Sequence, residues 1–251
     1  MGRRPRFVNV IRHVRATRPD IADPAAAIAA KRLVVDGRIV TSTNTLVSAR
    51  AAVVLRRARP LRGEDKLRTS LDAFGVAVAG RICLDVGASA GGFTRVLLER
   101  GAARVFAVDA GFGQLRGSLR AHSRVVNLER TNLSELGTAV ARCWEIEVVT
   151  MDISYLSVAV AVPQLEAVRL APNADLLALV KPMYELGLAG PPEEERMLRR
   201  AVDAARRGVE RGGFWVVTAA VPSPVIGARG AREWLIHGRR CDGSRGAKTH
   251  D

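Results

Sequence analysis

From residue 64 onward, short apolar runs alternate with longer stretches in which apolar positions recur at helical spacing. The apolar runs have few polar side chains on either face, which is typical of buried strands in a parallel sheet. We predict them at 81–86, 104–109, 124–128, 146–152, 175–181 and 213–220. Helices are predicted between most of them, with 66–78 before the first strand and 92–100 after it. The pattern predicts a doubly wound α/β domain.

The first 62 residues follow a different pattern. A segment rich in helix formers begins with Pro24, and Asp36-Gly37 separates two apolar runs, which is a hairpin signal. The predicted elements are a helix at 24–32 and short strands at 33–35, 39–40 and 53–55. A small α+β module therefore precedes the α/β domain.

Domain boundaries follow from changes in composition. The stretch 56–63 holds four arginines and a proline, which predicts an interdomain linker. The end of the chain is rich in glycine and charge, which is typical of disorder. We predict a module at 1–58, a linker at 59–63, an α/β domain at 64–238 and a disordered tail at 239–251.

Positive charge gathers in the N-terminal module. The net charge is +14, and residues 1–62 hold 14 Lys or Arg but only three acids. A polyanion such as RNA is the natural partner of such a module, since each neutralised phosphate releases counterions. Codon use in a GC-rich genome is the alternative explanation for 35 arginines against four lysines. It does not explain why the surplus lies at one end.

Several features predict a cytoplasmic protein without a membrane segment. No apolar run reaches the 18 or so residues that a spanning helix needs. The arginine-rich start of the chain has no apolar core of the kind that secretory signals contain. Cys83, Cys143 and Cys241 are far apart and form no CxxC pair, which fits a reducing compartment. No cluster with metal-ligand spacing is present, so no metal is predicted.

A glycine-rich run, LDVGASAGGFT at 84–94, lies where the first predicted strand meets its helix. Glycines there let backbone approach a ligand, and the helix N-terminus offers free N–H groups. Asp109 ends the next strand, where an acid can accept both hydroxyls of a nucleotide ribose. The run lacks G-x-G-x-x-G, and Asp85 suits a ligand that carries an ammonium group. Both observations favour S-adenosylmethionine over NAD.

Lysines are scarce, and two of them lie where they could do chemistry. Lys181 ends an apolar strand, at the edge where α/β sheets bind ligands, and Lys66 begins the helix before the first strand. Asp152 ends a further strand at the same edge. A lysine, unlike an arginine, can lose its proton when its surroundings lower its pKa. Each residue alone could be a solvated charge, but their joint placement favours a catalytic group.

Six segments of the chain resemble those of a known protein family. The segments that carry the resemblance are RGEDKL (62–67), LDVGASAGGFT (84–94), DAGFGQL (109–115), LERTN (128–132), MDISYLS (151–157) and LVKPMYE (179–185). They resemble the TlyA family of S-adenosylmethionine-dependent ribosomal RNA (cytidine-2′-O)-methyltransferases, from about Leu61 to Leu235. The resemblance implies an FtsJ-like, Rossmann-like methyltransferase domain, preceded by an RNA-binding module of the ribosomal-protein S-four type. Here that module is degenerate, because Asp23-Pro24 replaces the usual Ser-Arg pair.

The resemblance also implies roles for particular residues. The catalytic set would be Lys66, Asp152, Lys181 and Glu233, with Lys181 in the central role. Asp109 would bind the cofactor ribose. The remaining cofactor-binding residues would be Asp85, Gly87, Ala88, Ser89, Gly91, Gly92, Phe93 and Asn132, with Asn132 near the adenine. Asp85 would contact the cofactor ammonium or else hold the glycine turn, and Phe93 would contact the cofactor or simply pack in the core.

Three functions remain open at this level. The first is 2′-O-methylation of ribose in ribosomal RNA, with ribosomal subunits as partners and no obligate protein partner. The second is an RNA-binding paralogue with little activity, because Gly230-Ala-Arg-Glu233 departs from the Gly-Asn-x-Glu of the family. The third is a membrane-active haemolysin, a label that family members have carried, which no spanning or strongly amphipathic segment supports.

Overall fold

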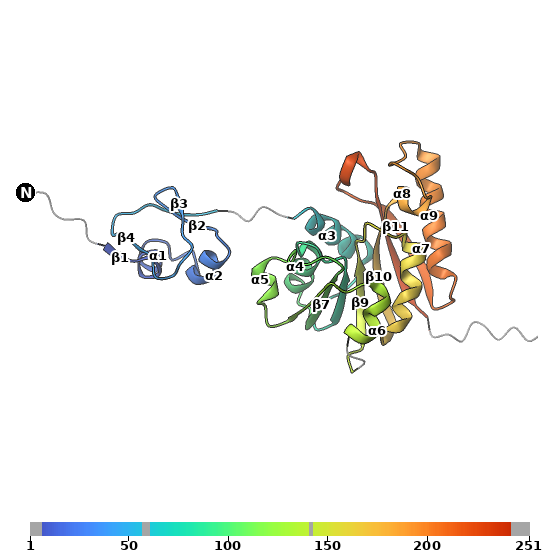
Figure 1. The fold of residues 1–251 in the computed structure, drawn as a ribbon, viewed down its shortest axis with the longest axis horizontal. Helices are drawn as coiled ribbons and strands as arrows, with labels where there is room; N and C mark the ends of the chain where they lie inside the picture. Colours follow the sequence, from blue (N-terminus) through green and yellow to red (C-terminus); the bar gives the residue numbers. More distant parts are fainter. Residues whose placement is uncertain (1–6, 57–60, 141–142, 242–251) are drawn as a thin grey trace, which may run out of the picture. The chain divides into compact units, whose positions relative to one another are not determined.

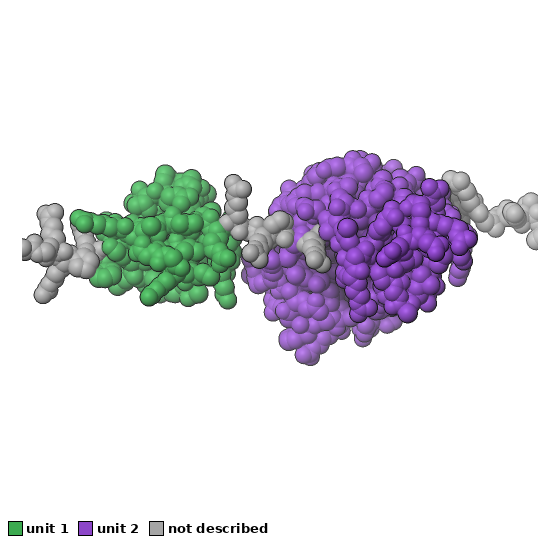
Figure 2. Space-filling model, turned by 90° about the horizontal axis from the view of Figure 1, so that it is seen from above, with its two compact units in different colours: residues 1–59 green, residues 60–251 purple. Residues whose placement is uncertain are grey.

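The computed structural model describes residues 7–56, 61–140 and 143–241. The chain divides into two compact units, Met1–Arg59 and Pro60–Asp251 (Figure 2). Among the described residues, no helix combines the length and apolar character needed to cross a membrane.

The N-terminal unit is a small α+β fold with two short sheets. Its elements are β1 (Phe7–Asn9), α1 (Val10–Thr17), α2 (Pro24–Ala29), β2 (Leu33–Val35), β3 (Arg38–Ile39), β4 (Leu46–Ser48) and β5 (Val53–Leu55). The sheets have the orders β1-β4 and β3-β2-β5. Asp36 and Gly37 both have positive φ, 46° and 77°, as a two-residue turn between right-twisted strands requires. The predicted hairpin is therefore confirmed, whereas β1, α1 and β4 were not predicted.

The second unit is built on a seven-stranded sheet of order β11-β12-β10-β9-β6-β7-β8 (Figure 1). Its strands are β6 (Ile82–Val86), β7 (Arg104–Asp109), β8 (Val125–Glu129), β9 (Ile146–Met151), β10 (Leu170–Val180), β11 (Trp215–Pro222) and β12 (Trp234–Arg240). Neighbours from β10 to β8 pair in parallel, while β12 runs antiparallel to both β10 and β11. Strand order reverses between β6 and β9, and such a switch point is where doubly wound sheets bind ligands.

Helices cover both faces of this sheet. They are α3 (Arg62–Phe74), α4 (Gly92–Glu99), α5 (Gly117–Arg120), α6 (Leu136–Ala139), α7 (Val158–Ala161), α8 (Pro182–Glu185) and α9 (Glu195–Glu210), with 3-10 turns η1 (Leu133–Glu135), η2 (Val162–Ala167) and η3 (Ala228–Gly230). Alternate side chains of β6 enter two different cores: Leu84 and Val86 face one, Cys83 the other. The predicted doubly wound, Rossmann-like fold is confirmed.

The first helix of this unit begins earlier than predicted. Arg62 and Gly63 belong to α3 and not to the linker predicted at 59–63. The Glu64 carboxylate accepts a hydrogen bond from the Leu61 backbone N–H at 3.1 Å, which stabilises a start at this point. Gly75, with φ of 65°, ends the helix four residues after Leu71, short of the predicted 78.

The predicted disordered tail is wrong at its beginning. Arg239 and Arg240 lie in β12, where they pair with β10 and β11. β12 itself was not predicted as a strand. Its Leu235 and Ile236 are buried because it is inserted between two other strands, a long-range pairing that a local pattern does not reveal. The rest of the predicted tail, 242–251, lies outside the described residues.

Candidate active site

Four charged side chains meet at the carboxyl edge of the sheet. Lys181 Nζ lies 2.6 Å from Asp152 Oδ1, and Lys66 Nζ lies 2.6 Å from Glu233 Oε2. The two pairs are linked, because Lys66 Nζ is also 4.0 Å from Asp152 Oδ2. Lys66 and Glu233 are buried, whereas Asp152 and Lys181 keep some exposure. The structure thus brings together all four residues expected to be catalytic, as a chain of alternating charges.

The topology of the sheet explains this meeting. Asp152 and Lys181 directly follow the parallel strands β9 and β10, so they come out at the same edge. Glu233 directly precedes β12, and that strand is antiparallel, with Trp234 opposite Val180. Its beginning therefore lies beside the end of β10.

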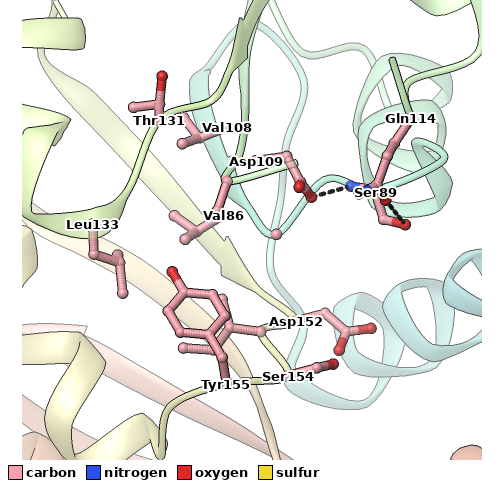
Figure 3. A pocket seen from close by; sticks show the side chains of 13 residues that line it. Val86, Ser89, Val108, Asp109, Gln114, Thr131, Leu133, Asp152, Ser154 and Tyr155 are labelled. Carbon is pink, nitrogen blue, oxygen red and sulfur yellow. Dashed lines mark hydrogen bonds between the residues drawn. The ribbon is translucent and has the colours of Figure 1, made fainter. Parts of the chain in front are cut away.

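A cavity of about 220 Å³ lies beside this group, at the switch point between β6 and β9 (Figure 3). Its apolar wall consists of Val86, Val108, Leu133 and Ile153. The polar lining comes from Ser89, Asp109, Gln114, Thr131, Asp152, Ser154 and Tyr155. An apolar slot with the Asp109 carboxylate in its lining suits a nucleoside, which presents a flat base and two ribose hydroxyls.

The Asp109 carboxylate is held in place by backbone donors. Oδ2 accepts from the Ser89 N–H at 2.8 Å (Figure 3), and Oδ1 accepts from the Gly111 N–H at 2.7 Å. Each oxygen has a second lone pair available for a ligand hydroxyl. The Ser89 hydroxyl donates to the Gln114 side chain at 3.2 Å, which ties the two loops at the cavity mouth together.

Gly87 cannot be replaced without moving the site. Its φ is 83°, and a Cβ atom there would lie 2.5 Å from the Asp152 carbonyl oxygen. Gly91 and Gly92 are closely packed: a Cβ at Gly91, where φ is 92°, would meet the Leu119 side chain, and one at Gly92 would lie 3.1 Å from the Gly63 Cα atom. The glycines therefore bring the loop against α3 and α5, and Gly87 brings it against Asp152.

Asp85 holds the glycine turn and does not line a described cavity. Its carboxylate is buried and accepts hydrogen bonds from Thr94 Oγ1 at 2.6 Å and Thr150 Oγ1 at 2.9 Å. It thereby joins β6 to the first turn of α4 and to β9. Of the two roles expected for Asp85, these contacts favour the structural one over contact with a cofactor ammonium.

Asp85 makes the stability of the unit depend on pH. Burial, opposed by the two threonine hydroxyls, raises the pKa of Asp85 from 3.8 to about 6. The folded state therefore binds this proton more tightly than the unfolded chain, and the contribution of Asp85 to stability falls as pH rises from about 4 to about 6. We expect Asp85→Asn to gain stability relative to the parent protein across that window, by roughly 3 kcal/mol at most.

Urea unfolding of both proteins at several pH values between 4 and 7 measures this difference. Asp203→Asn, at an exposed position of α9, controls for the loss of one negative charge. A difference between Asp85→Asn and the parent that stays constant with pH would contradict the prediction.

For two further residues expected to bind the cofactor, the structure gives less direct support. Phe93 is buried in the core and also lines a neighbouring cavity with Ala88, so its position is compatible with both expected roles. Asn132 is exposed and lines none of the described cavities, whereas its neighbours Thr131 and Leu133 line the nucleoside-sized one. A contact between the Asn132 side chain and an adenine stays a prediction.

Several polar residues that line cavities at this edge of the sheet were not singled out from the sequence, among them Gln114, Ser154 and Tyr155 of the nucleoside-sized cavity. Arg229 is another, and it lines a larger cavity together with the four charged residues. Ser154 Oγ lies 2.7 Å from Lys181 Nζ. Burial and the Asp109 charge raise the pKa of Tyr155, whose ring lines the nucleoside-sized cavity. Gln114, Ser154 and Tyr155 lie inside segments quoted for the family resemblance, which was the available signal. Arg229 lies outside them.

Comparisons with known proteins agree with this geometry. The family model of the FtsJ-like methyltransferases matches residues 61–239. The 16S/23S rRNA (cytidine-2′-O)-methyltransferase TlyA of Mycobacterium tuberculosis H37Rv is 41% identical over 222 residues, covering 84% of this chain and 81% of its own. The 23S rRNA (cytidine-2′-O)-methyltransferase TlyA of Campylobacter jejuni is 27% identical, covering 68% of this chain and 67% of its own.

Solved structures of other proteins share this fold. A Streptococcus thermophilus protein described as a hemolysin superposes with a TM-score of 0.69 at 26% identity, covering 95% of this chain and 90% of its own. Fibrillarin, in complex with Nop5p, superposes with a TM-score of 0.52 at 13% identity, covering 72% of this chain and 84% of its own, which shows a shared fold. The chain belongs to the FtsJ-like methyltransferases and, within them, to the TlyA family.

Proposed function

We propose that this chain transfers a methyl group from S-adenosylmethionine to a ribose 2′-hydroxyl of ribosomal RNA, with cytidine as the modified nucleoside. The observation that carries the proposal is the linked set of Lys181, Asp152, Lys66 and Glu233 beside the nucleoside-sized cavity. The names of the TlyA relatives support both the ribosomal RNA and the cytidine.

The residues at the cavity fit S-adenosylmethionine. The apolar wall formed by Val86, Val108 and Leu133 suits an adenine, and the fixed Asp109 carboxylate suits the two ribose hydroxyls. The methionine end would continue along Gly87 and Ser89, which line both this cavity and a second, larger cavity whose lining includes all four charged residues. When bound, the cofactor supplies an electrophilic methyl group on a sulfonium centre.

The four charged residues would act on the hydroxyl that receives the methyl group. As the oxygen bonds to the methyl carbon and the carbon–sulfur bond of the sulfonium group breaks, the oxygen must lose its proton, which the Lys181–Asp152 pair would accept. The Lys181 amine, held by Asp152 and Ser154, faces the charge that develops on the oxygen. Lys66 and Glu233 keep Asp152 in position from the buried side. In-line alignment of the hydroxyl with the methyl group supplies much of the remaining acceleration.

The same contacts bear on the inactive-paralogue hypothesis. Ala231 stands where the family has an amide, yet Glu233 still pairs with Lys66 at 2.6 Å. The departure from Gly-Asn-x-Glu therefore leaves the acid in contact with its partner, which favours an active enzyme. A ribosomal RNA substrate also agrees with the predicted cytoplasmic location and with a basic N-terminal module that binds RNA.

Asp109→Ala is expected to weaken binding of S-adenosylmethionine by about 10- to 100-fold, because a hydrogen bond to a charged group contributes roughly 1.5–3 kcal/mol. Isothermal titration calorimetry with the full chain measures the dissociation constant. Asp72→Ala, which removes an exposed acid of α3, is the matched control and should bind as the parent does. Equal affinity of Asp109→Ala and the parent would exclude Asp109 as the ribose ligand.

Methyl transfer from labelled cofactor to ribosomal subunits that lack the modification tests the function as a whole. After nuclease digestion, mass spectrometry should find the label in 2′-O-methylcytidine. Label on a base would contradict the reaction type, and label in another 2′-O-methylated nucleoside would contradict cytidine alone. Cofactor binding without transfer to any ribosomal RNA would support the inactive paralogue.

A further inference from the structure

The four charged residues line a larger cavity of about 580 Å³, which is open to solvent. Its charged lining residues are Lys66, Lys181, Arg229, Asp152 and Glu233, three cations and two carboxylates. Each lysine lies 2.6 Å from one of the carboxylates, so these four charges balance in pairs. Arg229 contributes the remaining positive charge of the lining.

Arg229 lies at the tip of a turn that closes over Glu233. The Gly227 N–H donates to the Ala231 carbonyl at 2.8 Å, which fixes the two ends of the turn. A Cβ atom at Gly227 would lie 2.3 Å from Glu233 Oε1, so the turn is packed directly on this carboxylate. The position of Arg229 is therefore coupled to that of the catalytic set.

The backbone of Arg229 is in the left-handed region, with φ of 55° and ψ of 28°. This conformation is unfavourable for residues with a side chain and favours glycine. A non-glycine residue that keeps it, in a wall of a candidate active site, is a reason to look for a functional role of its side chain.

The neighbouring arginine behaves differently. Arg232 Nη2 lies 3.0 Å from Glu195 Oε2, so α9 holds its guanidinium. Within the described part of the chain, Arg229 forms no such ion pair, and its side chain is exposed at the cavity. A free guanidinium beside two neutralised pairs is a site for an anion.

We propose that Arg229 binds a phosphodiester group adjacent to the ribose that is methylated. This inference rests on the proposed function, because an RNA acceptor brings a phosphate on each side of its target ribose. A guanidinium contacts two phosphate oxygens at once through its planar fork, which gives orientation as well as affinity. Arg229 thereby aligns the 2′-hydroxyl with the Lys181–Asp152 pair.

Arg229→Gly is the variant that tests this role, because glycine suits the left-handed backbone and leaves the turn intact. Its KM and dissociation constant for unmodified ribosomal subunits should rise about 10- to 100-fold, as for loss of a charged hydrogen-bonded contact. The slope of log affinity against log salt concentration should become shallower by about 1, as for one lost phosphate contact. Affinity for S-adenosylmethionine should stay unchanged. Arg229→Lys, which keeps the charge but not the fork, should give an intermediate KM.

Arg200→Ala removes an exposed arginine of α9 that does not line the cavity, and serves as the matched control. A parent-like KM, dissociation constant and salt slope for Arg229→Gly, in a protein that methylates ribosomal RNA, would overturn the inference and leave the proposed function standing. If the parent protein transfers no methyl group, the proposed function fails. In that case the dissociation constants and salt slopes of the parent and Arg229→Gly for ribosomal subunits still test whether Arg229 binds a phosphate: equal values would overturn the inference.

Discussion

Lys181→Ala is expected to lower the rate of methyl transfer by about 10²- to 10⁴-fold, the range found when a positioned acid–base group is removed. The Lys181 amine is the group closest to Asp152 that remains accessible from the cavity. Without it, the developing negative charge on the ribose oxygen has no fixed cation beside it. Because Lys181 lies after β10 and outside the apolar core, the variant should fold as the parent does.

Single-turnover transfer from labelled S-adenosylmethionine to ribosomal subunits measures this loss. Calorimetry should show that Lys181→Ala still binds the cofactor, which would indicate that its site is folded. Arg200→Ala, at an exposed position of α9, controls for the loss of one positive charge. A rate for Lys181→Ala within a few-fold of the parent would remove Lys181 from the proposed mechanism.

The second large effect is expected on stability. Lys66→Met leaves the buried Glu233 without its partner, and breaking one side of a buried ion pair costs about 3–5 kcal/mol. Adding Glu233→Gln removes the uncompensated charge, so the double variant should recover most of this loss. Both variants should be inactive in methyl transfer, since Asp152 loses its support from Lys66.

Urea unfolding at neutral pH, with the parent and all three variants, gives the free energies of this double-mutant cycle. Glu233→Gln alone completes the cycle and isolates the coupling between the two side chains. Additive effects of the two substitutions would mean that the 2.6 Å contact contributes nothing to folding.

The central sheet could be predicted from the sequence because its information is local. Each parallel strand is an apolar run, and the residue that follows it emerges at a known edge. This rule by itself places Asp109, Asp152 and Lys181 at one edge of the sheet. Glu233 was expected only from the family resemblance, because the strand after it pairs antiparallel with β10, and no local pattern specifies that neighbour.

Other features depend on contacts that the sequence does not display. The carboxylate of Asp85 accepts hydrogen bonds from two threonine hydroxyls, one of them 65 residues away in the chain, and the sequence pattern did not indicate either contact. The left-handed conformation of Arg229 could not be foreseen, since an arginine there gives no sign of a positive φ. The start of α3 was missed because its first turn lies in a stretch whose arginines and proline resemble a linker.

The insertion of β12 between β10 and β11 also matters while the protein is being synthesised. Lys66 and its partner Glu233 are 167 residues apart in the chain. Until a ribosome has released the last strand, β10 has a vacant edge, β11 has no neighbour in the sheet, and the acid opposite Lys66 is not yet in place. A nascent chain at that stage exposes unpaired strand edges, which favour aggregation. The insertion of β12 therefore completes both the sheet and the proposed active site. A product that ends before Glu233 would be both unstable and inactive.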